Sequence, residues 1–205
     1  MKIQNKRFVY LISPTKISNN IFYKTLELVL KSKKVSFFQL RLKNEKFAKK
    51  ILVAQKIIKI CRRYNVKFLV NDDPYLALKV NADGCHLGQN DMNIIEAKKI
   101  LKKKILGITC HNSIRLVKRA SEDGANYIAV GAFYKTNTKK VRYRAKISII
   151  KKIKKITNIP IVAIGGINEI NYKNLLLNKA NILAISSYIW RNKKYKPYEA
   201  IKKLR

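Results

Sequence analysis

The stretch KFLVNDDPYLALKVNADGCHLGQNDM, residues Lys67–Met92, contains a complete strand–helix–strand pattern. Lys67–Asp72 is an apolar run that ends in Asn-Asp, and it predicts a strand. Asp73–Val80 predicts a helix, because Pro74 stands at an early helical position where its missing N–H is tolerated. Ala82–Gly88 is a second short apolar run flanked by glycine. Apolar strands joined by a helix indicate a parallel sheet.

The same alternation continues in both directions along the chain. Further strands are expected at Lys6–Ile12, Val35–Lys43, Ile105–His111, Tyr127–Phe133, Ile159–Gly166 and Ile182–Ser187. Helices are expected at Asn19–Lys33, Asn44–Tyr64, Asn93–Lys103, Ser113–Asp123, Lys146–Thr157, Asn168–Lys179 and Pro197–Arg205. Eight such units in 205 residues predict an α/β protein with a single compact (β/α)8 TIM barrel over residues 1–205. The alternative is a doubly wound open sheet.

Composition restricts the class of protein. With 47% hydrophobic residues the chain is expected to fold, despite a formal net charge of +35. That charge suits either a nucleic-acid or acidic-membrane surface, or compositional drift, and drift is favoured because lysines occur along the whole length. The apolar run Phe8–Ile12 is too short for a signal peptide, and no run reaches the roughly 18 residues of a membrane span, so a soluble cytoplasmic protein is expected. Three widely spaced cysteines indicate neither a disulfide framework nor a zinc site.

Acidic residues are rare and locally clustered. The chain has 11 acidic against 46 basic residues, yet four of its five aspartates lie between Val70 and Met92. Asp72 ends one expected strand and Asp91 follows the next, so adjacent strand ends would bring the two carboxylates together. Mg²⁺ is held by one or two carboxylates, with water and substrate phosphate in its other positions. We therefore expect Asp72 and Asp91 to bind Mg²⁺, although both could instead be caps or turn residues, as is expected for Asp73 and Asp83.

Basic and polar side chains alternate in the segment VSFFQLRLK. Gln39, Arg41 and Lys43 share one face of this expected strand, and period two places them toward the barrel mouth if the apolar residues between them face the helices. Arginine and lysine there suit a phosphate group. An edge strand with a solvated face is the alternative.

Other candidate groups for phosphate follow later strands. Thr136, Thr138 and Lys139 lie in the long polar loop Tyr134–Ala145, which could simply be solvated. Gly165-Gly166 and Ser186-Ser187 end the last two expected strands, where (β/α)8 barrels commonly bind phosphate.

Both histidines follow a cysteine, so at most one residue of each pair can face the barrel interior. His111 ends a strand and could act as a general acid or base, although a structural or hydrogen-bonding role is favoured.

Several of these segments together resemble the thiamine-phosphate synthase family. They are QLRLK (39–43), LVNDD and ADGCHLGQND (between 69 and 91), GITCH (107–111), DGANYIAVGAFYKTNTKK (123–140), IPIVAIGGI (159–167) and ILAISSYIW (182–190). The resemblance implies a (β/α)8 transferase of thiamine biosynthesis. It would couple 4-amino-2-methyl-5-(diphosphooxymethyl)pyrimidine to a thiazole phosphate, with release of diphosphate in a dissociative, Mg²⁺-assisted reaction.

The resemblance also implies roles for individual residues. Binding of the pyrimidine diphosphate falls to Gln39, Arg41, Lys43, Asn71, Thr109 and Lys139, of which Arg41, Lys43 and Lys139 would be catalytic. Binding of the thiazole phosphate falls to Thr136, Thr138, Gly166, Ser186 and Ser187, and Mg²⁺ binding to Asp72 and Asp91. The chain departs from the family where QLREK becomes QLRLK and where Thr109 replaces a serine.

Two other functions remain alternatives. A thiazole tautomerase would share the barrel and the thiazole-phosphate pocket but have less need of the two aspartates. A basic nucleic-acid-binding protein would need clustered basic and aromatic residues, whereas the lysines here are dispersed. The expected partners are therefore small phosphorylated substrates, with neither nucleic acid nor membrane, and the sequence leaves the oligomeric state open.

Overall fold

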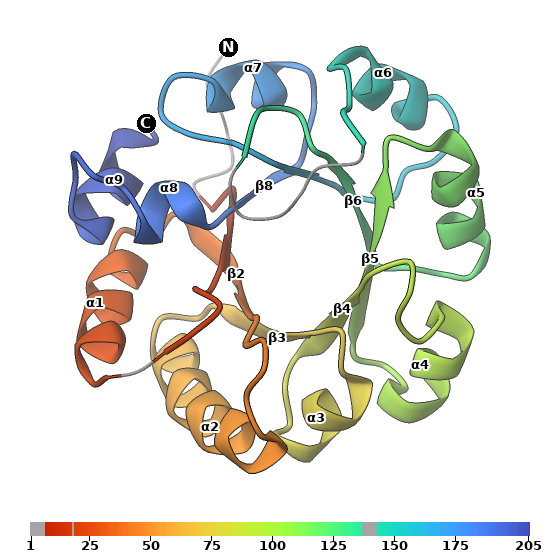
Figure 1. Ribbon diagram of the computed structural model, residues 1–205. Coiled ribbons are helices and arrows are strands. Elements are labelled where there is room, and N and C mark those ends of the chain that lie inside the picture. The colour runs from red at the N-terminus through yellow and green to blue at the C-terminus, as the bar shows by residue number, and fades with distance from the viewer. Residues whose placement is uncertain (1–6, 18, 137–142) are drawn as a thin grey trace.

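A computed structural model describes residues 7–17, 19–136 and 143–205 of the chain. Eight parallel strands close into a barrel in the order in which they occur in the sequence, and the helices form a ring around them (Figure 1). The strands are β1 (Val9–Ile12), β2 (Val35–Leu40), β3 (Lys67–Asn71), β4 (Gly84–Leu87), β5 (Ile105–His111), β6 (Tyr127–Gly131), β7 (Ile161–Ile164) and β8 (Ile182–Ile185). The predicted (β/α)8 barrel is confirmed, and the open sheet is wrong, because β8 pairs with β1.

The helices lie between the strands as predicted, with one addition. They are α1 (Ile21–Leu30), α2 (Phe47–Arg63), α3 (Pro74–Lys79), α4 (Ile94–Leu101), α5 (Ile114–Glu122), α6 (Ser148–Lys154), α7 (Tyr172–Leu177), α8 (Ser187–Trp190) and α9 (Pro197–Lys203). The sequence pattern did not predict α8, because four residues are too few to show a helical period.

Several strands end earlier than the apolar pattern predicts. The strand expected at Val35–Lys43 ends at Leu40, because the next amide leaves the sheet: the N–H of Arg41 donates to Ser13 Oγ at 2.9 Å. The strand expected at Ile105–His111 has the predicted bounds. The earlier ends turn predicted strand residues into βα-loop residues at the carboxyl rim, where barrel active sites are built.

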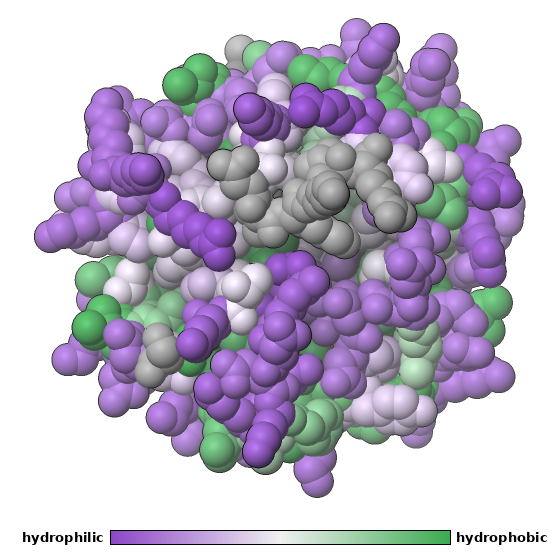
Figure 2. Space-filling model, in the orientation of Figure 1, coloured by the Kyte–Doolittle hydropathy of each residue, from purple (hydrophilic) through white to green (hydrophobic). Residues whose placement is uncertain are grey.

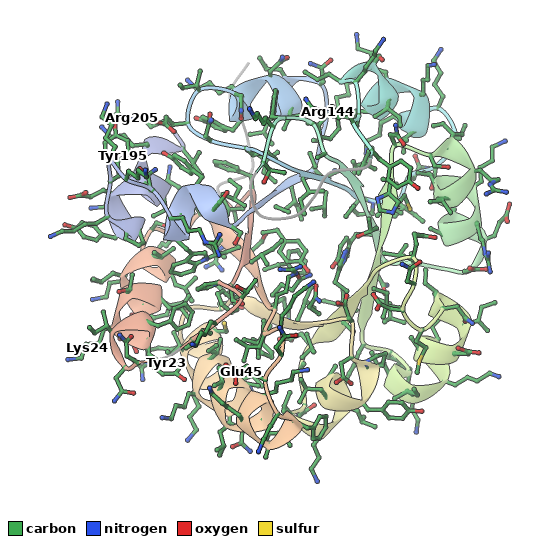
Figure 3. All side chains as sticks on the ribbon, viewed as in Figure 1. Tyr23, Lys24, Glu45, Arg144, Tyr195 and Arg205 are labelled. Atoms are coloured by element: carbon green, nitrogen blue, oxygen red, sulfur yellow. The ribbon has the colours of Figure 1, made fainter. Side chains whose placement is uncertain are left out.

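Two hydrophobic layers hold the fold together. The larger layer fills the space between strands and helices and includes Phe38 and Phe68, whose rings stack at 6.4 Å. The smaller layer lies inside the barrel and includes Tyr10, Leu69 and Tyr127. Side chains from the strands accordingly fill the centre of the ring (Figure 3). The interior is thus a packed core, with polar groups among its aromatic side chains.

Gly107 in β5 provides a test of this interior packing. A Cβ atom added there would collide with the ring of Tyr127 on the neighbouring strand, and β5 is paired on both sides. We expect Gly107→Ala to lower the free energy of unfolding by about 1–3 kcal/mol, because neither the ring nor the backbone has room to move. Urea unfolding measures this change, and an unchanged midpoint would show that the interior is looser than described.

Candidate active site

Two carboxylates meet at the ends of β3 and β4. Asp72 directly follows β3 with a φ of 65°, and its N–H donates to the carbonyl of His86 at 2.8 Å. Asp91 lies in the turn after β4, where its Oδ2 accepts from the N–H of Gly88 at 2.7 Å. The two side chains are in hydrogen-bond contact with each other. The positive φ and the turn therefore bring together two carboxyl groups that are 19 residues apart in the sequence.

The charge of this pair is unfavourable without a cation. Burial, and after it contact with the Asp91 carboxyl, raises the pKa of Asp72 to about 6, although Arg41 and the side chain of Asn71 oppose the shift. Two carboxyl groups in contact repel each other when both are ionised, so one of them tends to keep its proton. A divalent cation held by Asp72 and Asp91 would balance their negative charges, so these two carboxylates fit Mg²⁺.

Arg41 faces this pair from the end of β2. Its guanidinium is partly buried, and burial lowers the pKa of Arg41 while the nearby charge of Asp72 opposes that change. A guanidinium remains protonated in proteins, so the cation is retained at neutral pH. Its planar fork can donate two hydrogen bonds to phosphate oxygens.

The carboxylates open onto a pocket of about 440 Å³. Its lining residues are Leu42, Lys43, Lys50, Asn71, Asp72, Asp73, Pro74, Tyr75, Asp91 and Met92. The pocket therefore contains both predicted metal ligands and two of the predicted diphosphate residues, Lys43 and Asn71. The sequence did not single out Lys50, because nothing in the pattern of α2 distinguishes this lysine from the others on the helix; the folded structure places it in the pocket lining.

The other two aspartates of the cluster have structural roles. Asp73 caps α3 by accepting from the N–H of Leu76 at 2.8 Å, as expected. Asp83 precedes β4, at the opposite end from Asp91, and accepts from the N–H of Phe68 at 2.8 Å. It also pairs with Lys67.

A row of buried hydrogen bonds runs from Gln39 to Thr109 through the barrel interior. Gln39 Nε2 donates to the Tyr10 hydroxyl, which contacts the Tyr127 hydroxyl, both at 2.8 Å. Tyr127 contacts His86 Nδ1 at 2.9 Å, and His86 Nε2 contacts Thr109 Oγ1 at 2.9 Å. Burial lowers the pKa of His86 to about 4, so this imidazole is neutral at pH 7.

Sequence reasoning missed Tyr10, Tyr127 and the inward role of His86. Strand alternation could have placed each of them inside the barrel, but it does not tell which residues meet across the interior. Cys85, the neighbour of His86, faces the outer layer. Cys61, Cys85 and Cys110 are all buried free thiols.

The loops after β6 and β7 lie against each other at the same rim. The N–H groups of Phe133 and Tyr134 donate to the carbonyls of Ile164 and Gly165 at 3.1 and 3.0 Å. Gly166 has a φ of 64°, and a Cβ atom there would collide with the carbonyl of Lys135. The close approach therefore requires glycine and places Gly166 beside the chain that leads into Thr136.

The remaining predicted phosphate residues are only partly described. Ser186 and Ser187 begin α8 after β8, and Ser186 Oγ donates to the Ser13 carbonyl at 3.4 Å. Thr138 and Lys139 lie outside the described residues.

His111 ends β5, and its ring lies 4.6 Å from that of Tyr143. Next to it, Asn112 Nδ2 donates to the carbonyl of Arg144 (labelled in Figure 3) at 2.9 Å. These contacts link the end of β5 to the segment that precedes α6. They agree with the favoured structural role of His111 and leave its acid–base role a prediction.

No group of three or more His, Cys, Asp and Glu residues gathers at a possible metal site in the described ranges. Among the same residues, no helix has both the length and the apolar character needed to cross a bilayer.

The chain is a parallel (β/α)8 barrel with paired carboxylates, an arginine and a lysine at its carboxyl rim, which is the end where (β/α)8 enzymes bind their substrates. A family model described as thiamine monophosphate synthase matches residues 9–189. The chain therefore belongs to the thiamine monophosphate synthase family.

Individual relatives agree with this assignment. A thiamine-phosphate synthase of Pelagibacter ubique is 66% identical over 201 residues, which cover 98% of this chain and 97% of the relative. A thiamine-phosphate synthase of Saccharophagus degradans is 39% identical over 187 residues, which cover 88% of this chain and 84% of the relative. The solved structure of a thiamine phosphate pyrophosphorylase from Pyrococcus furiosus superposes with a TM-score of 0.85 at 27% identity, covering 100% of this chain and 96% of that one.

Proposed function

We propose that the chain is a thiamine-phosphate synthase. It would join 4-amino-2-methyl-5-(diphosphooxymethyl)pyrimidine to a thiazole phosphate and release thiamine phosphate and pyrophosphate. Family membership supports the choice of reaction. The observation that carries the proposal in this chain is the contact between the Asp72 and Asp91 carboxyls beside Arg41, because such a site suits a diphosphate leaving group with its cation.

The residues of the pocket would act by positioning and by stabilising charge. Breaking the C–O bond leaves a pyrimidine-stabilised carbocation and places negative charge on the departing diphosphate, and the thiazole nitrogen then forms the new bond. Arg41 and Lys43 would bind the diphosphate oxygens, with Lys139 as a further cation. Gln39, Asn71 and Thr109 would hold the same substrate in place.

Mg²⁺ would be held by Asp72 and Asp91. When bound, it supplies positive charge to the diphosphate oxygens and so favours departure of the leaving group. The thiazole phosphate would bind at Thr136, Thr138, Gly166, Ser186 and Ser187, which follow the last three strands. We also place the reaction in the cytoplasm, because such highly charged substrates do not cross a bilayer unaided.

The proposal is tested by incubating the purified protein with both substrates and Mg²⁺ and measuring thiamine phosphate and pyrophosphate. We expect the two products in equal amounts. Interconversion of thiazole phosphate tautomers without coupling, surviving in Asp72→Ala, would favour the tautomerase instead.

The basic surface supports a general attraction for anionic substrates. Hydrophilic residues spread over the coloured part of the viewed face, with apolar patches between them (Figure 2). A spread of basic residues raises encounter rates with small anions, whereas single-stranded nucleic acid requires a groove lined with cations and aromatics. Nucleic-acid binding that competes with the substrates and weakens steeply with salt would contradict this interpretation.

The raised pKa of Asp72 predicts a pH dependence of stability in the metal-free protein. The folded-state pKa of about 6 lies above the ordinary value of 3.8. The contribution of Asp72 is therefore fully present below pH 3.8 and is lost as pH rises through about 6. We expect Asp72→Asn to melt a few degrees higher than the wild type at pH 8, roughly 2–4 °C, and to show no such gain at pH 4.

Thermal melts in chelator at the two pH values measure this difference. Adding Mg²⁺ should raise the melting temperature of the wild type and not that of the variant, because the cation binds the folded pair. Equal melting temperatures of wild type and variant at both pH values would show that the two carboxyls do not repel each other.

A further inference from the structure

The hydrogen-bond row inside the barrel connects two predicted substrate residues. Its ends are Gln39 and Thr109, and its middle members are Tyr10, Tyr127 and His86. Tyr10 is 2% exposed, Tyr127 4% and His86 8%, so water cannot replace a missing partner at these positions. The polar protons of Tyr10, Tyr127 and His86 must therefore find acceptors within the row.

This requirement fixes which group donates in each hydrogen bond between Gln39 and Tyr127. The Tyr10 oxygen accepts from Gln39 Nε2. Across the described ranges, Tyr127 is the other group that the structure places within hydrogen-bond distance of the Tyr10 hydroxyl. If Tyr127 donated to Tyr10, the Tyr10 proton would be left without a partner in the interior. Tyr10 therefore donates to Tyr127.

The second half follows from the first. Tyr127 has accepted from Tyr10, so its own proton goes to His86 Nδ1. A neutral imidazole that accepts at Nδ1 carries its proton on Nε2, which then donates to Thr109 Oγ1. Among the residues that the structure describes, none is seen to accept the Thr109 proton, and Thr109 is only half-buried.

We propose that Tyr10, Tyr127 and His86 are positioning residues that hold the Thr109 hydroxyl as a hydrogen-bond donor toward the diphosphate. The same row engages Gln39 Nε2 and leaves Gln39 Oε1 as an acceptor for the amino group of the pyrimidine. This inference rests on the proposed function for the identity of the substrate. A diphosphate offers acceptors and an amino group offers donors, so both ends of the row match the substrate.

A double-mutant cycle on pyrophosphate binding tests the connection. Without the Tyr127 hydroxyl, His86 Nδ1 loses its donor, and the imidazole can take the tautomer that accepts from Thr109. We expect Tyr127→Phe to weaken binding of inorganic pyrophosphate in Mg²⁺ about tenfold, the equivalent of about 1.4 kcal/mol. In a Thr109→Val background the same change should have almost no further effect, whereas Thr109→Ser should keep the full effect.

A matched pair at His86 tests the direction of the row. The amide nitrogen of glutamine can take the place of Nε2 and donate to Thr109, whereas asparagine reaches only the position of Nδ1. We expect His86→Gln to stay within about threefold of the wild-type pyrophosphate affinity, and His86→Asn to lose about as much as Thr109→Val. A purely structural histidine would give no such difference between the two variants.

Two outcomes would overturn the proposal. One is a Tyr127→Phe effect of equal size with and without the Thr109 hydroxyl, and the other is no effect in either background. Titration calorimetry gives the affinities, and thermal melts verify that each variant is folded. Because pyrophosphate binding needs no turnover, a positive cycle in a protein without coupling activity would contradict the proposed function alone.

Discussion

Asp72→Asn and Asp91→Asn are each expected to lower the coupling rate by at least about 100-fold. Asparagine keeps the shape of the side chain, but it removes the charge and one oxygen that would hold Mg²⁺ against the diphosphate. The fold should be retained, since the two carboxyls repel each other rather than stabilise the barrel. Initial rates with both substrates at saturating Mg²⁺ measure the effect.

Asp83→Asn is the matched control for these variants. It makes the same chemical change at the opposite end of the barrel, and its side-chain oxygen can still accept from the N–H of Phe68. We expect near wild-type coupling from it. Near wild-type rates in Asp72→Asn or Asp91→Asn would instead refute metal ligation at that residue.

Arg41→Ala is expected to lower kcat/KM for the pyrimidine diphosphate by about 100- to 1,000-fold. The guanidinium lies near Asp72, where it could contact diphosphate oxygens and compensate their charge as the bond breaks. Steady-state kinetics with the pyrimidine substrate varied measure the loss. Arg41→Lys separates charge from shape and should recover part of the activity, because lysine keeps the cation and loses the planar fork.

A second measurement shows whether Arg41 acts on the pair of carboxyls as well. Arg41 opposes the rise in the pKa of Asp72, so its removal should raise that pKa further. Titration of Asp72 by NMR in the metal-free protein reports this shift. Unchanged kinetics together with an unchanged pKa would mean that the guanidinium points away from the site.

Much of this arrangement could be predicted from the sequence. The strand–helix alternation predicted the barrel, and the rule that parallel strands end at the same rim predicted that Asp72 and Asp91 lie close together. Polar residues at strand ends are informative, although some of them, such as Asp73, serve as helix caps. The roles of these residues toward metal and substrate remain predictions that the geometry supports.

The parts that the sequence did not predict depend on contacts across the interior. Alternation places Tyr10, Tyr127 and His86 on inward faces, but the row they form with Gln39 and Thr109 requires the register of five strands at once. The early end of β2 had a similar cause, because Ser13, which directly follows β1, accepts a hydrogen bond from the N–H of Arg41. Short elements such as α8 carry too little pattern to be recognised.

The binding of pyrophosphate tests the central claim most directly, because it needs the carboxylate pair and Arg41 together. Titration calorimetry would compare the wild type in Mg²⁺, the wild type in chelator and the Asp72→Asn/Asp91→Asn double variant in Mg²⁺. We expect tight binding in the first case and a loss of at least about tenfold in the other two. Equal affinity in all three would mean that no cation joins these aspartates to the diphosphate, and the proposed site would be wrong.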